Sequence, residues 1–445
     1  EKQSELSKMQ EQFSQFQSQS EKLRKQSQEI DRKLSQSKQL SFESKSKIKD
    51  WMNEQKEQLN KLEKSVKKQQ ALNKEKSISK DPEIEKRKKD LNDRMDRLKD
   101  PELEKLMKEL NELLKKNAHK EDVQRKMNQM NRAFKSQEDE IDALKEQLKE
   151  LQLEEGIKEQ SERMNEWIEK EKELSERTKE AKKEDVEKIS EELQSQNKEL
   201  ENIKEQAEKL QELNKELNDP MKLEMGDSEI HEAQKESTEA EQNLQKKQNQ
   251  QSSDNQKKAA EEMEKAKDKM EESLSKAKEQ RNSEDMESLR SLLENLIEVS
   301  HRQEKVFTEL KLLKSDNPKV LDLNKQQINL RDLSLGIEDS LRALAKRQPM
   351  VSDLVTREMD EINNRMEDAI ASLKIRDVTR SAMEEQYVMT GFNNLAVMLM
   401  ESLKNVQQKM SQQSKQHSKN SKSCSNPNSQ GKQGKKGQGS KLSES

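Results

Sequence analysis

KEDVQRKMNQMNRAFKSQEDEIDALKEQLKEL, residues 120–151, indicates an all-helical fold. Its apolar side chains recur at alternating spacings of about four and three: Val123, Met127, Met130, Phe134, Ile141, Leu144, Leu148 and Leu151. This heptad pattern is typical of a helix that packs against other helices along one seam. A second stripe follows at Ile189, Leu193, Leu200, Ile203, Ala207, Leu210 and Leu217. We therefore expect a long coiled coil over 120–218, with Gly156 as a break in its packing.

The composition agrees with extended helices. Of the 445 residues, 40% are charged, 28% are hydrophobic and 2% are aromatic. An ordinary globular domain is about 45–50% apolar, counting Gly, and about 25% charged, so three compact cores are not expected. With only 8 Gly and 6 Pro, the chain does not resemble a fully disordered one. The predicted fold is all-α, with long antiparallel or folded-back coiled-coil helices, a C-terminal four-helix bundle and a disordered tail.

The first two regions precede this coiled coil. Residues 1–78 form a predicted Ser/Gln-rich coiled coil, whose seam places Ser20 and Ser27 among Phe13, Phe16, Leu23 and Ile30. Residues 79–119 contain a near-repeat, in which Asp81-Pro82-Glu83 recurs as Asp100-Pro101-Glu102. Asp is a good helix cap and Pro suits the first helical turn, so each copy predicts a corner followed by a short helix.

Asp219-Pro220 is expected to end the long coiled coil, because a residue before proline is disfavoured in the helical conformation. Gly226 and the polar run 248–255 predict a flexible hinge over 219–256. Helix is expected to resume over 257–283, where Ala and Met line a narrow face.

Apolar residues become denser over 284–410, which is the part that can bury a globular core. Breaks at Asn317-Pro318, at Gln348-Pro349 and near Arg376 divide it into four predicted helices. Short connections require antiparallel neighbours, so a helical bundle is expected. Residues 411–445, rich in Ser, Gln, Lys and Gly, are predicted to be a disordered basic tail.

The charge distribution bears on partners. The chain has 87 Lys and Arg against 91 Asp and Glu, with an acidic middle between basic ends. A rod that binds nucleic acid needs a continuous basic face, so nucleic acid is not an expected partner. We expect protein partners on coiled-coil or bundle surfaces, with 284–410 as the main docking region, and a second copy of the chain is one candidate. The seams leave open whether the helices pair within one chain or between chains.

Catalytic motifs are weak. Glu298 and His301 form one ExxH pair, whereas di-iron bundles use two, and no other histidine follows a Glu at this spacing. A solvated pair is the expected interpretation. Cys424 lies in the basic tail without a base held near it, and no phosphate-binding loop motif occurs. We therefore predict a non-enzymatic protein without catalytic residues, cofactor or metal.

Several stretches together resemble a known family: the two Asp-Pro-Glu corners, the Met-rich 257–270, Met286–Leu296, and above all Asn393–Leu399, followed by a Cys, an Asn-Pro and a Gly/Lys-rich tail. They resemble the long helical region of large Bacteroidetes envelope proteins, a family defined by a domain of unknown function. The resemblance implies a larger protein of the bacterial cell envelope, anchored by membrane helices that precede this region, and it supplies no catalytic residues. The chain is then expected to be a scaffolding segment that meets the membrane only through an N-terminal part outside it. The alternative is a coiled-coil arm of an ATPase whose catalytic heads lie outside the sequence.

Overall fold

The computed structural model describes residues 2–37, 39–74, 82–98, 101–116, 118–182, 184–348, 351 and 353–420. All regular secondary structure in these ranges is helical, which confirms the all-α prediction. The helices are α1 (Lys2–Gln36), α2 (Phe42–Lys74), α3 (Pro82–Arg97), α4 (Pro101–Lys115), α5 (Lys120–Glu180), α6 (Val186–Lys215), α7 (Asp227–Gln245), α8 (Asn249–Leu312), α9 (Lys319–Arg347), α10 (Asp353–Lys374) and α11 (Val378–Asn420).

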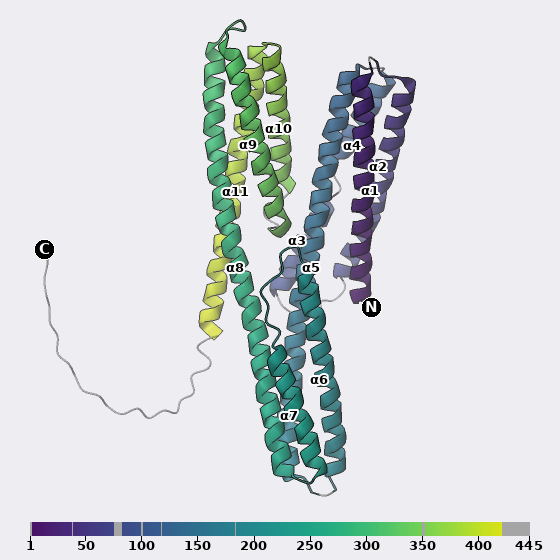
Figure 1. Cartoon of the computed structure of the whole chain (residues 1–445), viewed down its shortest axis with the longest axis vertical. Coiled ribbons are helices and arrows are strands. Elements are labelled where there is room, and N and C mark those ends of the chain that lie inside the picture. The colour runs from purple at the N-terminus through teal and green to yellow at the C-terminus, as the bar shows by residue number, and fades with distance from the viewer. Residues whose placement is uncertain are drawn as a thin grey trace, which may run out of the picture.

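The helices form three bundles that share two long helices (Figure 1). The N-terminal bundle contains α1 to α4 and the first half of α5. The middle bundle contains the second half of α5, α6, α7 and the first half of α8, and the C-terminal bundle contains the rest of α8 with α9 to α11. With 61 and 64 residues, α5 and α8 are each about 90–95 Å long at 1.5 Å per residue. Each passes through two bundles without a break.

The N-terminal bundle buries the predicted seam. Phe13, Phe16, Leu23 and Ile30 lie in its core, and Ser27, at the skipped position, is completely buried. The Ser27 hydroxyl accepts a hydrogen bond of 2.6 Å from Asn131 Nδ2 of α5, which explains how a polar residue occupies the seam.

The two short helices begin where the Asp-Pro-Glu repeat predicts, at Pro82 and Pro101, while Asp81 and Asp100 lie outside the described residues. In succession, α3 and α4 form one side of the N-terminal bundle, facing α5. Their apolar faces explain this position: Ile84 and Leu91 of α3, and Leu103 and Leu110 of α4, are all buried.

The prediction that Gly156 breaks the 120–218 coiled coil is wrong. α5 continues through Gly156, and the chain reverses at 181–185 to form an antiparallel pair of α5 and α6. A Cβ on Gly156 would lie 2.3 Å from Leu210 Cδ2 of α6, so the glycine lets the two helices approach closely.

The predicted flexible hinge over 219–256 is also wrong. Its core is α7, which buries Ile230, Ala233 and Ala240, and its last residues begin α8. The polar run 248–255 is not exposed as a hinge would be, because it packs against α7. Ser252, for example, is buried and donates a 2.7 Å hydrogen bond to the Ala240 carbonyl. Gly226 does mark a turn, since it adopts φ 73° immediately before α7.

The C-terminal bundle contains the four predicted helices, and α8, α9, α10 and α11 bury one continuous apolar cluster. The predicted boundary at 283/284 lies inside α8, which is unbroken there. α11 continues to Asn420, so the predicted tail does not begin at 411 as a disordered segment. Ser411–Asn420 has no Gly or Pro to stop a helix that has already formed. Residues 421–445, with Cys424, lie outside the described residues.

Candidate functional site

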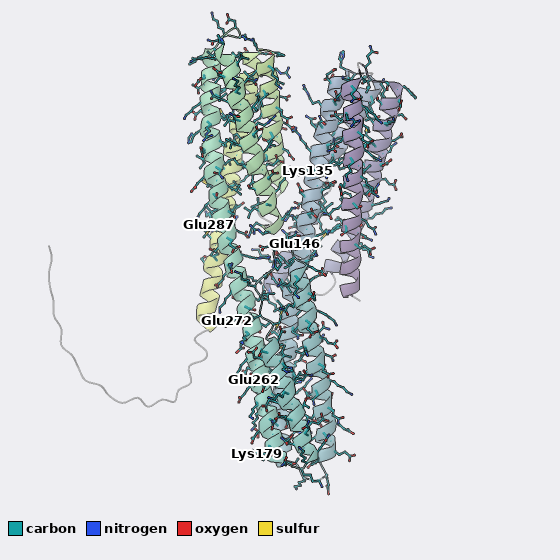
Figure 2. All side chains as sticks on the ribbon, viewed as in Figure 1. Lys135, Glu146, Lys179, Glu262, Glu272 and Glu287 are labelled. Carbon is teal, nitrogen blue, oxygen red and sulfur yellow. The ribbon has the colours of Figure 1, made fainter. Side chains whose placement is uncertain are left out.

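The three bundles meet at a cluster of buried charges, which we call the charged junction. It comprises α3, residues 132–155 of α5, residues 216–219, residues 278–285 of α8, residues 338–347 of α9 with the following Gln348, and Asp360 of α10. Figure 2 shows Lys135 and Glu146 on α5, where this helix of the N-terminal bundle passes beside the C-terminal bundle; these two bundles are the upper ones in the view. The junction is the region in which the three bundles contact one another.

Arg342 joins three helices. Its guanidinium donates hydrogen bonds to Asp139 of α5 and Asp360 of α10, both at 2.9 Å, and to Glu338 of α9 at 2.8 Å. Only 7% of Arg342 is exposed. Burial opposes its charge, but Asp360 and Glu338 outweigh this effect and raise the pKa of Arg342. Asn363 supports the arrangement by donating to the second oxygen of Glu338 at 2.5 Å.

Asp360 is held in an environment that opposes its charge. Burial raises the pKa of Asp360 to about 7, although Arg342 favours the ionised form. The Arg342 cluster therefore contains one carboxyl group that titrates near neutral pH.

Arg94 connects the N-terminal bundle to the C-terminal bundle. This α3 residue is 3% exposed and binds Glu140 of α5 through two nitrogens, Nη2 lying 2.8 Å from Oε2. The same Nη2 donates to the carbonyl oxygen of Ala345 in α9 at 3.2 Å. One guanidinium thus bridges helices of two bundles, through a charge-assisted pair and a backbone contact.

Glu150 and Glu154 connect α5 to both α3 and α8. Glu150 lies 2.6 Å from Arg281 Nη1 and 3.3 Å from Arg87 Nη2. Glu154 pairs with Arg87 and, at 2.9 Å, with Lys278. Burial raises the pKa of Glu150. Burial acts the same way on Glu154, but Arg87 and Lys278 outweigh it and hold the pKa of Glu154 below its ordinary value.

Arg347, at the end of α9, connects to the middle bundle. Its guanidinium lies 3.4 Å from Asp219, in the connection between α6 and α7, and 3.4 Å from Asp285 of α8. Gln348 donates to the other oxygen of Asp285 at 2.5 Å. The Asp219-Pro220 corner, predicted only as a helix end, therefore also supplies a carboxylate to the junction.

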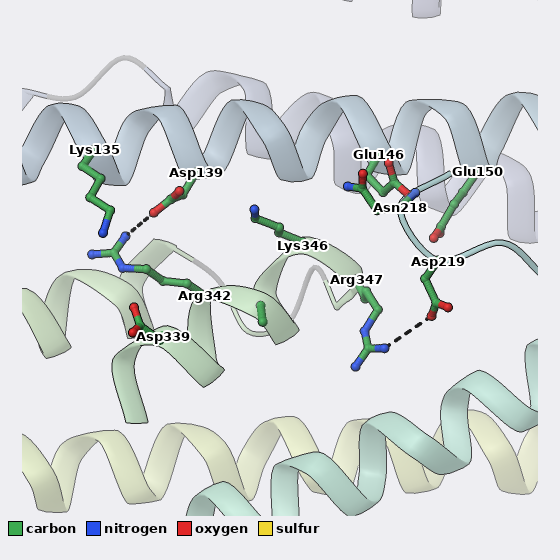
Figure 3. Close-up of a pocket in the computed structure, with 11 residues that line it drawn as sticks. Lys135, Asp139, Glu146, Glu150, Asn218, Asp219, Asp339, Arg342, Lys346 and Arg347 are labelled. Carbon is green, nitrogen blue, oxygen red and sulfur yellow. Dashed lines mark hydrogen bonds and ion pairs between the residues drawn. The ribbon is translucent and has the colours of Figure 1, made fainter. Parts of the chain in front are cut away.

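A cleft of about 460 Å³ lies inside the charged junction (Figure 3). One wall is acidic, with Asp139, Glu146 and Glu150 of α5 beside Asp219. The facing wall belongs to α9 and carries Arg342, Lys346 and Arg347. The Glu146 carboxylate also accepts a hydrogen bond from the Asn218 backbone N–H at 2.5 Å. Lys135 of α5 and Asp339 of α9 also line the cleft, so the two walls have opposite net charge and attract each other.

The charges of the junction are paired with one another. Each acidic group of the central pairs is matched by an arginine or lysine at ion-pair distance, and no group of His, Cys, Asp and Glu among the described residues could hold a metal ion. Truncating one partner of such a buried pair lowers the free energy of unfolding, because it leaves the other charge buried without a partner.

Glu298 and His301, the ExxH pair of the sequence, differ from the buried charges of the junction. Both are exposed on α8, where Glu298 pairs with Arg302 and the His301 ring is 3.9 Å from Glu304. Both side chains face solvent, as expected for a solvated pair. In the part of the chain that the structure describes, no helix combines the length and apolar character needed to cross a membrane.

Sequence reasoning did not identify the residues of the junction. Arg94, Glu140 and Arg342 are ordinary in a chain that is 40% charged, and none lies in a recognisable motif. Only the folded structure singles them out. Near Ile141–Leu151, α5 is buried around most of its circumference, so charged side chains there need partners.

Comparisons with known proteins add little to this geometry. No family model matches the chain, and no curated protein matches it. The crystal structure of HMP-1 M domain aligns with 80% of this chain and 92% of its own length, at 14% sequence identity and a TM-score of 0.21. Because that TM-score is far below the level of a shared fold, the function has to be inferred from the residues of this chain.

Proposed function

We propose that this chain is a non-enzymatic scaffolding segment, a stiff spacer in which three helical bundles are held in one arrangement. The observation that carries the proposal is the charged junction, where buried ion pairs join α3, α5, α8, α9 and α10 at the point where the bundles meet. The unbroken α5 and α8 support it, because a continuous helix resists bending better than a loop.

The spacer is proposed to act as a single chain. The apolar seams of α1, α2 and α5 are occupied by helices of the same chain, and so are those of α6 to α11. Protein partners are proposed to bind the C-terminal bundle. Of the eleven exposed large apolar side chains among the described residues, ten belong to this bundle, and Tyr387 and Val397 on α11 are two of them.

The resemblance to large Bacteroidetes envelope proteins extends the proposal. In that setting the spacer belongs to a larger membrane-anchored protein, and the bundles are displayed at a distance from the anchor. This extension depends on the sequence resemblance alone.

Light scattering combined with small-angle X-ray scattering tests the spacer proposal. The expected result is a monomer whose folded part is about 100 Å long, because α5 and α8 each extend from the tip of the middle bundle to the tip of an upper bundle. A dimer, or a particle several times longer, would contradict it.

A further inference from the structure

The most exposed apolar side chains of the described residues gather at one end of the molecule. Phe42 is 89% exposed, Leu312 is 82% exposed and Ile375 is 74% exposed, while the other exposed large apolar side chains are at most 57% exposed. Phe42 begins α2, Leu312 ends α8, and Ile375 lies between α10 and α11. The three turns concerned lie at the same end of the long axis, one on the N-terminal bundle and two on the C-terminal bundle (Figure 1). We call this end the tip face.

The two turns of the C-terminal bundle form one unit. Arg376, which follows Ile375, adopts φ 61° and donates hydrogen bonds of 3.2 Å to the carbonyl oxygens of Ser315 and Asp316, between α8 and α9. This contact holds the α10–α11 turn against the α8–α9 turn. Leu312 and Ile375 therefore flank two turns that are in contact.

Basic side chains outnumber acidic ones in the segments of the C-terminal bundle that carry Leu312 and Ile375. On the C-terminal bundle they are Lys311, Lys314, Lys319, Lys374, Arg376 and Arg380, against the acidic Glu309, Asp316, Asp322 and Asp377. Among the described residues, Lys314, Lys319 and Lys374 have no ion-pair partner, and all three are exposed. On the N-terminal bundle, α1 and α4 carry Lys33 and Lys115 in their last turns, but Lys115 pairs with Glu112, and the first turns of α2 and α5 carry Glu43, Glu121 and Asp122. The excess of basic groups therefore lies on the C-terminal bundle.

Part of this pattern has a simpler origin. Lysines near helix C-termini balance the helix dipole, and single exposed apolar residues are common on protein surfaces. The opposite end of the molecule serves as a comparison, because its turns are also lysine-rich. There, however, Ala181 and Val186 pack against the core of the middle bundle, and no large apolar side chain among the described residues is exposed.

The arrangement of the tip face bears on the kind of partner. A protein groove would accept one turn, but the apolar side chains lie on the turns of two separate bundles. A broad, flat partner reaches both at once. Apolar side chains that protrude from a basic surface match the interface of an anionic bilayer, where Phe and Leu enter the headgroup region and Lys and Arg meet negative lipids.

We propose that the tip face docks on an anionic lipid surface, with Phe42, Leu312 and Ile375 inserted and Lys314, Lys319 and Lys374 at the headgroups. This contact is separate from any membrane anchor outside the chain and does not depend on the spacer function.

Vesicle binding of the full chain tests the proposal. The probes are vesicles of phosphatidylcholine alone and vesicles with about one third phosphatidylglycerol. The chain should bind the anionic vesicles, and F42S/L312S/I375S should weaken binding at least about ten-fold, because each insertion removes a large apolar side chain from water. These side chains are exposed, so the variant should fold normally. The matched control L333S/L335S/M400S changes exposed apolar residues on α9 and α11, away from the tip turns, and should bind like the parent.

A site-specific probe separates the tip face from the basic tail, which could also attract anionic vesicles. In a Cys424→Ser background, an environment-sensitive dye at Ser315→Cys should shift to the blue on vesicle binding, and a dye at Lys182→Cys, at the opposite end, should not. Binding without a shift at residue 315, equal binding of F42S/L312S/I375S, or no binding to anionic vesicles would each overturn the proposal. Binding of a soluble acidic protein at the tip in place of vesicles would overturn it as well.

Discussion

Replacing Arg342 with methionine should weaken the contact between the C-terminal and N-terminal bundles. The guanidinium donates to Asp139, Glu338 and Asp360, and methionine fills much of the same volume without a charge. Removing one member of a buried ionic cluster typically costs about 3–5 kcal/mol, because the remaining charges are left without compensation. We expect a loss of that size at pH 8.

The cost should depend on pH in a definite direction. The pKa of Asp360 is about 7 in the folded chain, against an ordinary value of 3.8, and it should rise further without Arg342. As the pH falls from 8 to 6, Asp360 takes up a proton and the repulsion among the carboxylates decreases. Since one pKa unit corresponds to about 1.4 kcal/mol, the destabilisation should shrink by roughly 1 kcal/mol over this interval.

The assay must report on one part of the chain, because three connected bundles are not expected to unfold in a single step. Native-state hydrogen exchange of peptides from the C-terminal end of α9 gives the local opening free energy. Arg302→Met is the matched control, since Arg302 pairs with Glu298 on the exposed surface of α8 and such pairs contribute at most about 1 kcal/mol. If R342M costs no more than R302M, the charged junction does not hold the bundles together.

Two further predictions concern the bundle interiors. Burial raises the pKa of Glu171 to about 8 from an ordinary 4.5, so the folded chain binds this proton more tightly than the unfolded chain and stability should fall as the pH rises from about 5 to 8. Glu171→Gln should therefore gain about 1–3 kcal/mol at pH 8 and little at pH 5, measured by urea unfolding followed by Trp167 fluorescence in a Trp51→Phe background. No gain at pH 8 would show that the carboxyl is hydrated. Gly226→Ala should cost about 1–3 kcal/mol, because φ is 73° and a Cβ would lie 2.7 Å from Ala266 Cα, as tested by the thermal midpoint. Gly336→Ala, in a helix with nothing near the added Cβ, should instead gain about 0.5–1 kcal/mol, and equal effects of the two substitutions would contradict the close packing of α7 on α8.

The elements that could be predicted from sequence are those whose pattern is local. The heptad stripe from Val123 to Leu151 is buried as expected, and Ser27 occupies the seam because Asn131 supplies a hydrogen bond. Pro82, Pro101 and Pro318 begin or immediately precede helices. These features depend on side-chain spacing and backbone restriction, which the sequence records directly.

The features that were missed depend on contacts between distant segments. The turn at 181–185 has neither Gly nor Pro, and it is stabilised by Asp185, whose carboxylate accepts a 3.2 Å hydrogen bond from the Lys182 N–H. The hinge prediction depends on Gly226 and the polar run 248–255, and α7 gives little signal against it. Between Ile230 and Leu244, its buried face is formed by Ala233, Ser237 and Ala240, which are small or polar. The charged junction joins Arg94 to Ala345 and Arg342 to Asp139, pairs that only the folded chain brings together.

The distance between the tips of the two upper bundles tests the central claim most directly. Spin labels at Glu121→Cys, at the start of α5, and Asp316→Cys, between α8 and α9, would report this distance by electron–electron resonance in a Cys424→Ser background. If the charged junction holds the bundles in one arrangement, the distribution is a single narrow peak, and R342M broadens it. A broad distribution in the parent chain, or an unchanged narrow peak in R342M, would contradict the claim that buried ion pairs make this chain a stiff spacer.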